Sequence, residues 1–188
     1  MNPRPAVRPG GRSARVQESV HRAVRELQAE QAALTVPLVA ARAGVTPSTV
    51  YRRWGDLQEL LSDVAVERLR PDSPPADHGS LRADLEHWAA AFLEEMSSPA
   101  GRSYVRDALA GDPDGPNAGQ CSAYAREQVE ALLARATDRG EHVPETETVM
   151  DHVVAPMMYR VLFRPGPLDA GYARDLVATV FSRLMPLP

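Results

Sequence analysis

The chain has 188 residues, of which 44% are hydrophobic and 24% charged, a balance that is typical of a folded protein and argues against disorder. Its single cysteine, Cys121, excludes an internal disulfide and fits a reducing cytoplasm. No signal-peptide pattern and no apolar run of about 18 residues is visible, so we expect neither a secretion leader nor a membrane-spanning helix.

Charge is distributed unevenly along the chain. Residues 1–70 contain 11 Arg against 7 acidic residues, a net charge of +4, although the whole chain carries −4. Residues 71–188 contain the other 10 Arg against 18 acidic residues, a net charge of −8. The negatively charged phosphates of a nucleic acid attract residues 1–70 and repel residues 71–188. The sequence therefore predicts that one end of the molecule binds nucleic acid.

The N-terminal third begins with a segment that has no periodicity. Residues 1–12 are rich in Pro and Arg, and we predict a flexible basic arm, which either follows a DNA groove or is a plain disordered tail. A helical stripe of apolar residues follows and predicts the first helix of a domain that covers residues 13–70. The stripe consists of Val16, Val20, Val24 and Leu27.

Residues 35–54 have the pattern of two short helices joined by a tight turn. Gly44 lies in the turn, where a left-handed backbone is accessible to glycine without strain. Thr46 and Pro47 suit the cap and the first residue of the second helix, because proline lacks a donor that the first turn leaves unused. Apolar residues lie where the two helices would cross, at Val39, Ala43, Val45 and Val50. The pattern predicts a helix-turn-helix whose second helix is the DNA recognition helix.

The exposed face of that second helix carries hydroxyl, aromatic and guanidinium groups. Two helices and a glycine turn also occur in helical proteins that never bind DNA. An ordinary solvated helix in so acidic a chain should carry Glu and Asp, however, and this face has none. We therefore predict DNA contacts from Thr46, Pro47, Ser48, Thr49, Tyr51, Arg52 and Arg53, and a core position for Trp54.

The run from Ala43 to Trp54, followed by Gly-Asp-Leu-Gln-Glu-Leu-Leu, resembles the N-terminal domain of tetracycline-repressor-like (TetR family) regulators. The resemblance extends from about Arg15 to Leu69, and it adds Thr35, at the place of the family's usual threonine, to the predicted DNA contacts. Two features depart from the family pattern: Leu57 stands where a phosphate-contacting lysine is common, and Gln31–Leu34 replaces a Gly-aromatic turn. Asp56 and Glu59 resemble a capping box at the start of the next helix.

Residues 71–79, with three prolines and a glycine, form the clearest break and predict a domain boundary. Beyond it, apolar residues recur at helical spacing in a second domain, residues 80–188, and no alternating strand pattern occurs. We expect its last two helices at about 145–163 and 168–185. The fold class predicted for the whole chain is all-α, with about nine helices: a three-helix helix-turn-helix domain followed by a helical ligand-binding and dimerisation domain.

The last two helices resemble, more loosely, the C-terminal end of the same family. There these helices pair with their symmetry mates in a four-helix dimer interface, whereas in a monomer they would be ordinary core helices. Pro156 should remove one backbone hydrogen bond and bend the first of them. The resemblance implies a homodimer interface formed by Val153, Met157, Arg160, Val161, Val177 and Phe181.

The second domain also contains enough aromatic and sulfur-containing side chains for an apolar pocket. Stripes of this kind are more often plain core, but family members commonly bind small molecules in this domain. The resemblance therefore implies a small-molecule effector, and the aromatic and sulfur-containing side chains of this acidic domain predict that it is apolar or weakly cationic. The candidate ligand-binding residues are Trp88, Phe92, Met96, Tyr104, Tyr124 and Met157.

No signature of a catalytic nucleophile, a metal site or a phosphate loop is present. The five histidines are scattered, and no two of them have the i, i+4 spacing of a helical metal site. We therefore expect no catalytic residue, no metal and no cofactor. The hypothesis is a cytoplasmic, homodimeric transcriptional repressor that binds a near-palindromic operator and is released by a small apolar ligand. The alternatives are a helical enzyme or a protein-interaction module in which the helix-turn-helix is fortuitous.

Overall fold

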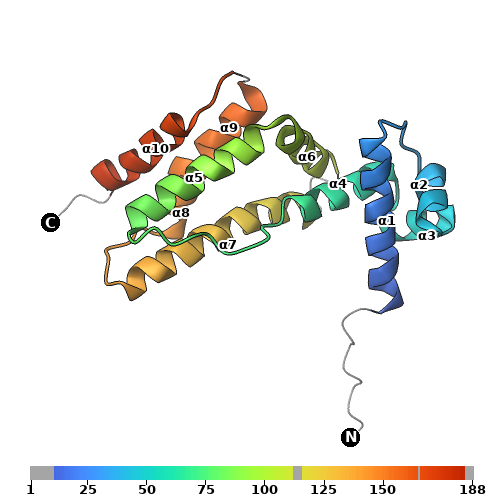
Figure 1. Ribbon diagram of the computed structural model, residues 1–188, viewed down its shortest axis with the longest axis horizontal. Coiled ribbons are helices and arrows are strands. Elements are labelled where there is room, and N and C mark those ends of the chain that lie inside the picture. Colours follow the sequence, from blue (N-terminus) through green and yellow to red (C-terminus); the bar gives the residue numbers. More distant parts are fainter. Residues whose placement is uncertain (1–10, 112–115, 165, 185–188) are drawn as a thin grey trace, which may run out of the picture. The chain divides into compact units, whose positions relative to one another are not determined.

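The computed structural model describes residues 11–111, 116–164 and 166–184 (Figure 1), and these contain helices and no strands. The first seven helices are α1 (Arg12–Ala29), α2 (Val36–Ala43), α3 (Pro47–Trp54), α4 (Leu57–Arg68), α5 (Leu81–Ser97), α6 (Pro99–Ala110) and α7 (Pro116–Asp138). An eighth runs through α8 (Thr146–Val149), the π-helical turn η1 (Met150–Val154) and α9 (Ala155–Phe163). A ninth joins α10 (Ala170–Thr179) to the π-helical turn η2 (Val180–Leu184). The predicted all-α fold with about nine helices is confirmed. No helix in the described ranges is long and apolar enough to cross a membrane.

The packing of the chain defines two compact units, Met1–Val64 (unit 1) and Ala65–Pro188 (unit 2), which divide within α4. The proline-rich residues 71–79 lie in unit 2, where two side chains of α7 hold them. Gln128 donates a hydrogen bond to the carbonyl oxygen of Ser73, and Arg135 donates one of 2.9 Å to that of Pro75. The break in the sequence is therefore a segment packed along α7.

The core of unit 1 forms where α1, α2 and α3 meet. Val20, Val24 and Leu27 of α1 contact Val39 of α2 and Val50 of α3, and each of these side chains is at most 1% exposed. The apolar stripe predicted for the first helix is thus its buried face. This small core fixes the two helices of the helix-turn-helix on α1.

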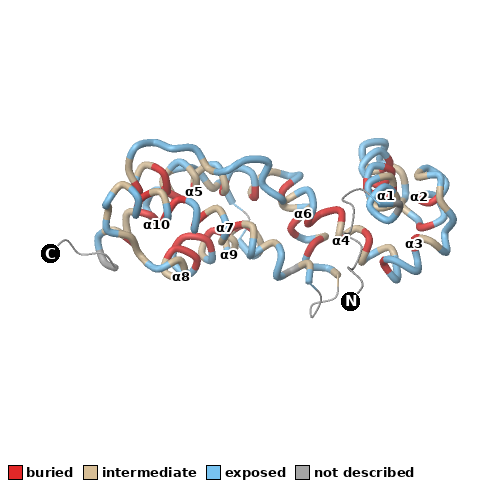
Figure 2. The backbone as a smooth tube through the Cα atoms, turned by 90° about the horizontal axis from the view of Figure 1, so that it is seen from below, coloured by how far each residue is buried: buried red, intermediate tan, exposed pale blue. Residues whose placement is uncertain are grey.

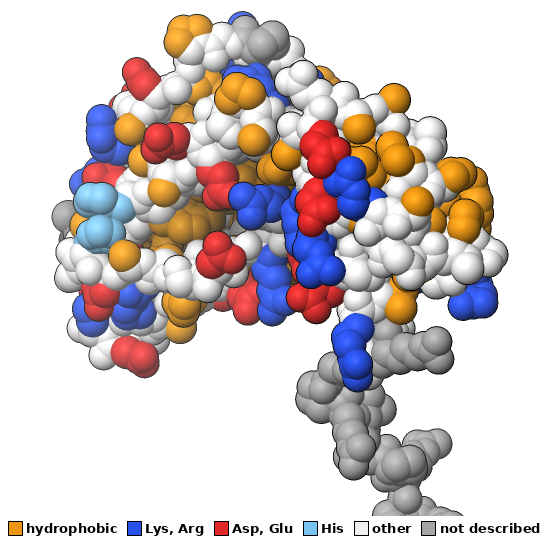
Figure 3. Space-filling model, turned by 45° about the vertical axis from the view of Figure 1, so that its right-hand side comes forward, with side chains coloured by type: hydrophobic (Ala, Val, Ile, Leu, Met, Phe, Trp, Pro, Cys, Tyr) orange, Lys and Arg blue, Asp and Glu red, His pale blue; other side chains and the backbone are white. Residues whose placement is uncertain are grey.

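The core of unit 2 is built around α5, which packs most extensively against α10 and also contacts α6, α7 and α9. Its fully buried residues, drawn red in Figure 2, include Leu85 and Leu93 of α5, Leu132 of α7 and Val177 of α10. On the face drawn in Figure 3, hydrophobic side chains are scattered among charged ones. Such single exposed apolar residues are ordinary on a protein surface.

Pro156 is accommodated by a local change of helix type. The turn before it, Met150–Val154, is π-helical, and the N–H of Ala155 donates to the carbonyl oxygen of Met150. Pro156 has no N–H to donate, so the wider turn carries the hydrogen-bond pattern past a position where an α-helix would lose one bond. The hydrogen bond that Pro156 was predicted to remove is therefore absent at a π-helical turn, which lies just before the proline.

Candidate DNA-binding site

The turn between α2 and α3 has the geometry that the sequence predicts. Gly44 has φ 70° and ψ 30°, in the left-handed region, and the N–H of Val45 donates to the carbonyl oxygen of Ala40 at 3.0 Å. Thr35 caps α2, since its hydroxyl accepts the N–H of Leu38 at 3.3 Å. Thr46 stands at the cap position of α3 with Pro47 as the first helical residue. Thr35 therefore fixes the start of α2, Gly44 fixes its end, and Pro47 marks the start of α3.

The exposed face of α3 carries the predicted contact residues. Thr46, Pro47, Ser48, Tyr51, Arg52 and Arg53 are exposed and Thr49 is partly exposed, whereas Val50 and Trp54 are buried. The Thr46 hydroxyl does not cap the helix. Its oxygen lies 3.0 Å from that of Ser48 and 2.9 Å from that of Thr49, so three hydroxyl groups form an exposed cluster at the start of α3.

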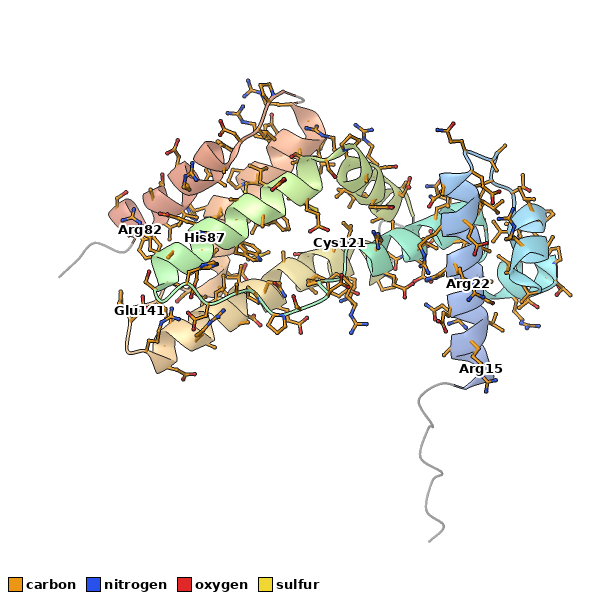
Figure 4. The ribbon with its side chains drawn as sticks, in the orientation of Figure 1. Arg15, Arg22, Arg82, His87, Cys121 and Glu141 are labelled. Carbon is orange, nitrogen blue, oxygen red and sulfur yellow. The ribbon has the colours of Figure 1, made fainter. Side chains whose placement is uncertain are left out.

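A groove lies between the first turns of α1 and the exposed face of α3. Eight residues line it: Ser13, Val16, Gly44, Val45, Thr46, Thr49, Arg52 and Arg53. Hydroxyl groups and guanidinium groups can all donate hydrogen bonds to phosphate oxygens. Arg15 and Arg22 also lie on α1 (Figure 4) and add positive charge to this helix.

The two arginines of α3 are in different situations. Arg53 donates from Nη1 to the hydroxyl of Ser13 at 2.7 Å and to its carbonyl oxygen at 3.3 Å, and from Nη2 to the side chain of Gln17. Arg52 has no hydrogen bond or ion pair with any residue that the structure describes. The structure therefore leaves Arg52 free for DNA and ties Arg53 to α1.

A third arginine near the turn is also engaged within the protein. Arg42 of α2 donates to both carboxylate oxygens of Glu30, at 2.8 and 2.9 Å. The hydrogen bonds raise the pKa of Arg42 and lower the pKa of Glu30. Arg42 thus joins α2 to the end of α1.

Behind the recognition helix lie polar side chains that were not among the predicted site residues. The indole N–H of Trp54 donates to Oδ2 of Asp63 at 2.7 Å, and Nε2 of His21 lies 2.9 Å from the same oxygen. Burial by itself raises the pKa of Asp63, but hydrogen bonds from His21 and Trp54 outweigh it and the pKa is lowered. The available signal was His21 and Gln17 within an otherwise apolar helical stripe.

The candidate ligand residues fall into two separate groups in unit 2. Trp88 and Phe92 stack with ring centroids 5.3 Å apart and pack with Met96 and Met157 in the main core, where both methionines are buried. Tyr104 and Tyr124 pack instead with Ala65, Val66 and Ala108 in a smaller cluster. Four of the six candidate residues therefore pack in the main core of unit 2 and two in the smaller cluster.

The candidate interface residues are mostly interior. Val153, Met157, Val161 and Val177 are at most 1% exposed within one chain. Arg160 and Phe181 are partly exposed, with their side chains against Tyr172 and Arg82 respectively. Four of the six residues thus pack inside the subunit, because an apolar stripe on a helix can face its own core as well as a partner.

Other side chains of the same helix are exposed. Tyr159 is 55% and Phe163 is 69% exposed, and their rings are 5.6 Å apart on α9.

As for metals, no group of three or more His, Cys, Asp or Glu in the described part of the chain could hold an ion.

Comparison with known proteins follows the same division of the chain. Residues 22–64 match the family model for bacterial regulatory proteins of the tetR family, and residues 75–180 match the model for the tetracyclin repressor-like C-terminal domain. An uncharacterized HTH-type transcriptional regulator of Bacillus subtilis, YdeS, is 26% identical over 155 residues, which cover 79% of this chain and 78% of YdeS. The HTH-type transcriptional regulator AqdR of Rhodococcus erythropolis is 35% identical over 68 residues, 36% of this chain and 33% of AqdR.

Solved structures share the fold. A putative TetR-family transcriptional regulator from Mesorhizobium loti has a TM-score of 0.56 and 16% identity, over 91% of this chain and 97% of that one. A TetR transcriptional regulator from Agrobacterium tumefaciens has a TM-score of 0.54 and 20% identity, over 92% and 94%. The two family models together span both units, and this family consists of regulators rather than enzymes. The chain therefore belongs to the tetR family and is a DNA-binding transcriptional regulator.

Proposed function

We propose that this regulator is a repressor that binds a near-palindromic operator as a homodimer, in the cytoplasm where bacterial chromosomal DNA lies, and that a small apolar ligand releases it. Residues 13–70 serve as the DNA-binding domain, with residues 1–12 as a basic arm, of which residues 1–10 lie outside the described residues. Residues 80–188 serve as the ligand-binding and dimerisation domain. The observation that carries the proposal is the exposed face of α3, which has hydroxyl, phenol and guanidinium groups and no carboxylate.

The residues of this face have two roles on DNA, contacts to base edges and contacts to the phosphate backbone. Thr46, Ser48 and Thr49 lie in the first turn of α3, the part of a recognition helix that approaches base edges. Arg52 has its full set of donors available for a guanine or a phosphate. Arg53 and Thr35 have partners within the protein, so we assign them to holding helices in place and, through their exposed edges, to the DNA backbone.

Replacing Arg52 by alanine should weaken binding to the specific site by about 1–3 kcal/mol, because a bidentate contact to guanine is lost. The specific site comes first from genomic DNA fragments that the purified protein selects, and affinity is then measured on the selected and on a random duplex. Arg106→Ala, at an exposed arginine of α6, is the matched control and should leave both affinities within two-fold. An equal loss on both duplexes would assign Arg52 to a phosphate.

The dimer proposal rests on the exposed aromatic pair of α9. Phe163→Glu should convert a dimer at micromolar concentration to a monomer, because a carboxylate at a buried apolar contact is costly. Leu109→Glu, at a 47% exposed position on α6, is the control and should stay dimeric. Sedimentation measures the state, and the intact dimer should protect half-sites about 34–36 Å apart. A monomeric wild-type protein with full operator affinity contradicts the proposal.

The effector proposal is supported by the apolar character of unit 2 around Trp88 and Phe92, which are only partly buried at the edge of the main core. A ligand shifts the equilibrium only if it binds one conformation more tightly than the other. An apolar compound that releases the operator should therefore also change the fluorescence of Trp88. The assay measures release of the protein from its selected duplex as apolar compounds are added. If no compound releases it, the protein is a constitutive DNA-binding factor.

A further inference from the structure

One carboxylate oxygen collects hydrogen bonds from side chains of two other helices. Oδ2 of Asp63, on α4, lies 2.7 Å from the indole nitrogen of Trp54 on α3 and 2.9 Å from Nε2 of His21 on α1. The side-chain amide nitrogen of Gln17, also on α1, lies 3.4 Å from it. His21 is fully buried and Trp54 is 8% exposed. These four residues, which we call the Asp63 network, all belong to unit 1.

The chemistry of the network requires an anion at its centre. An ionised carboxylate only accepts hydrogen bonds, so the indole N–H, the amide N–H and a proton on Nε2 of His21 must all point toward Asp63. Burial alone would raise the pKa of Asp63, but the hydrogen bonds from His21 and Trp54 and the positive charge of Arg53 lower it below its ordinary value. The carboxylate therefore stays charged at neutral pH.

The network holds the last turn of the recognition helix at two points. Trp54 reaches Asp63 directly. Its neighbour Arg53 reaches it through Gln17, whose side-chain oxygen accepts from Arg53 while its amide nitrogen points to Asp63. Successive residues of a helix project about 100° apart. Two attachments separated by that angle oppose rotation of α3 about its own axis, which a single contact would permit.

Rotation of α3 matters because the hydroxyl cluster and Arg52 lie on its exposed face. Side-chain atoms lie about 6 Å from a helix axis, so a rotation of roughly 20° would displace them by about 2 Å. A hydrogen bond to a base edge tolerates only a few tenths of an ångström. Contacts to phosphates depend mainly on charge, so they tolerate such a displacement better.

We propose that Asp63 is a positioning residue for DNA recognition: it sets the rotation of α3 and thereby the sequence specificity of the regulator. The proposal rests on the proposed function, in which α3 contacts base edges. A positioning role differs from an ordinary stabilising role in its effect on binding. Loss of the network should weaken affinity for specific DNA more than affinity for random DNA while the protein remains folded.

Two conservative variants test the proposal. Asp63→Asn keeps the size of the side chain and removes its charge, whereas Trp54→Phe keeps an apolar ring and removes only the indole donor. Glu26→Gln is the matched control, because this exposed carboxylate of α1 pairs with Arg22 and Arg42 and has no hydrogen bond or ion pair with a residue of α3 in the described part of the chain. DNA affinities are measured at a temperature at which circular dichroism shows every variant to be folded.

The expected result for Asp63→Asn and for Trp54→Phe is a loss of at least ten-fold on the selected duplex and of less than two-fold on random DNA. The double variant should lose much less than the sum of the two single losses, because Trp54→Phe removes the hydrogen bond that Asp63→Asn weakens. Glu26→Gln should change neither affinity by more than two-fold. Equal losses on both duplexes, or additive losses in the double variant, would overturn the positioning role.

Nuclear magnetic resonance of the DNA-free protein tests the network independently of its function. The chain has two tryptophans, so its spectrum should show two indole N–H signals, which Trp54→Phe assigns. Asp63→Asn should shift the signal of Trp54 and leave that of Trp88 in place. An unmoved Trp54 signal would overturn the hydrogen bond to Asp63. Failure of the wild-type protein to select any DNA would instead overturn the proposed function, and with it the role in recognition.

Discussion

Replacing Gly101 by alanine should destabilise unit 2 by about 3 kcal/mol, the upper end of the range for overpacking a core. Ser98 ends α5 and also caps α6, so the two helices meet at a sharp corner, and Gly101 is buried in the first turn of α6. A Cβ atom there would lie 2.0 Å from the carbonyl oxygen of Glu95 and 3.0 Å from the Cα of Met96. These are backbone atoms, so relief requires the corner itself to open.

Helix propensity predicts the opposite sign. Alanine is favoured over glycine inside a helix by about 1 kcal/mol, and Gly101 has no positive φ that would favour glycine. The cost of the clash must therefore exceed the gain in helix propensity for the alanine variant to be less stable. Gly119→Ala supplies the comparison, because a Cβ atom at this exposed position of α7 meets nothing within 4 Å and should stabilise the protein by up to about 1 kcal/mol.

Urea unfolding of both variants, followed by circular dichroism, measures the two effects. The prediction requires changes of opposite sign at two glycines that both lie in the first turns of helices. If Gly101→Ala proved as stable as the wild-type protein, the close approach of α5 and α6 at this corner would be wrong.

The helices and the turn of the recognition motif were predictable because their determinants are local. Gly44 adopts the predicted left-handed conformation, and Oδ1 of Asp56 accepts the N–H of Glu59 at 2.9 Å, as the capping pattern indicates. The last two helices, expected at about 145–163 and 168–185, are observed at residues 146–163 and 170–184. Caps, glycine turns and a 3.6-residue period are each specified within a few neighbouring residues.

The partners of individual polar side chains were not predictable, because they come from distant parts of the chain. The sequence places Arg52 and Arg53 on the same basic face, and only the structure shows that Arg53 is bound to Ser13, 40 residues away. Periodicity also cannot tell which surface an apolar stripe covers. Nor does a family resemblance show it: Val153 and Val177 became interface candidates from the resemblance, although both are buried within one subunit.

Asp84 and Arg139 illustrate a structural role that arises entirely from such distant pairing. Asp84, in the first turn of α5, is 1% exposed, and its Oδ1 accepts the backbone N–H of His78. Its Oδ2 accepts from Arg139 at 3.0 Å. Arg139 donates in turn to Glu141 at 2.7 Å, and Glu141, beside the start of α5 in Figure 4, accepts the N–H of Leu81 at 2.8 Å. The group joins the start of α5 to the end of α7.

Asp84→Ala should lower the free energy of unfolding by about 2–3 kcal/mol at pH 7, because it leaves the N–H of His78 without its acceptor and removes a hydrogen bond between charged groups. Asp77→Ala is the matched control. Asp77 accepts from the same guanidinium, but its side chain is 53% exposed, and exposed ion pairs contribute less than about 1 kcal/mol. Equal losses in the two variants would show that the burial of Asp84 has no energetic consequence.

The effect of Asp84→Ala should also depend on pH. Burial opposes ionisation of Asp84, but the N–H of His78 and the guanidinium of Arg139 outweigh it, so its pKa in the folded protein is lowered. A carboxyl group with a lowered folded pKa stabilises the protein fully above its unfolded pKa of about 4. That contribution is lost as the pH falls through the folded value, because the proton then binds in both states. The difference in unfolding free energy between wild type and Asp84→Ala should therefore be constant from pH 7 to about pH 5 and should shrink below about pH 4. A difference that stays the same down to pH 2 would mean that the ionised form of Asp84 has no stabilising partner in the folded protein.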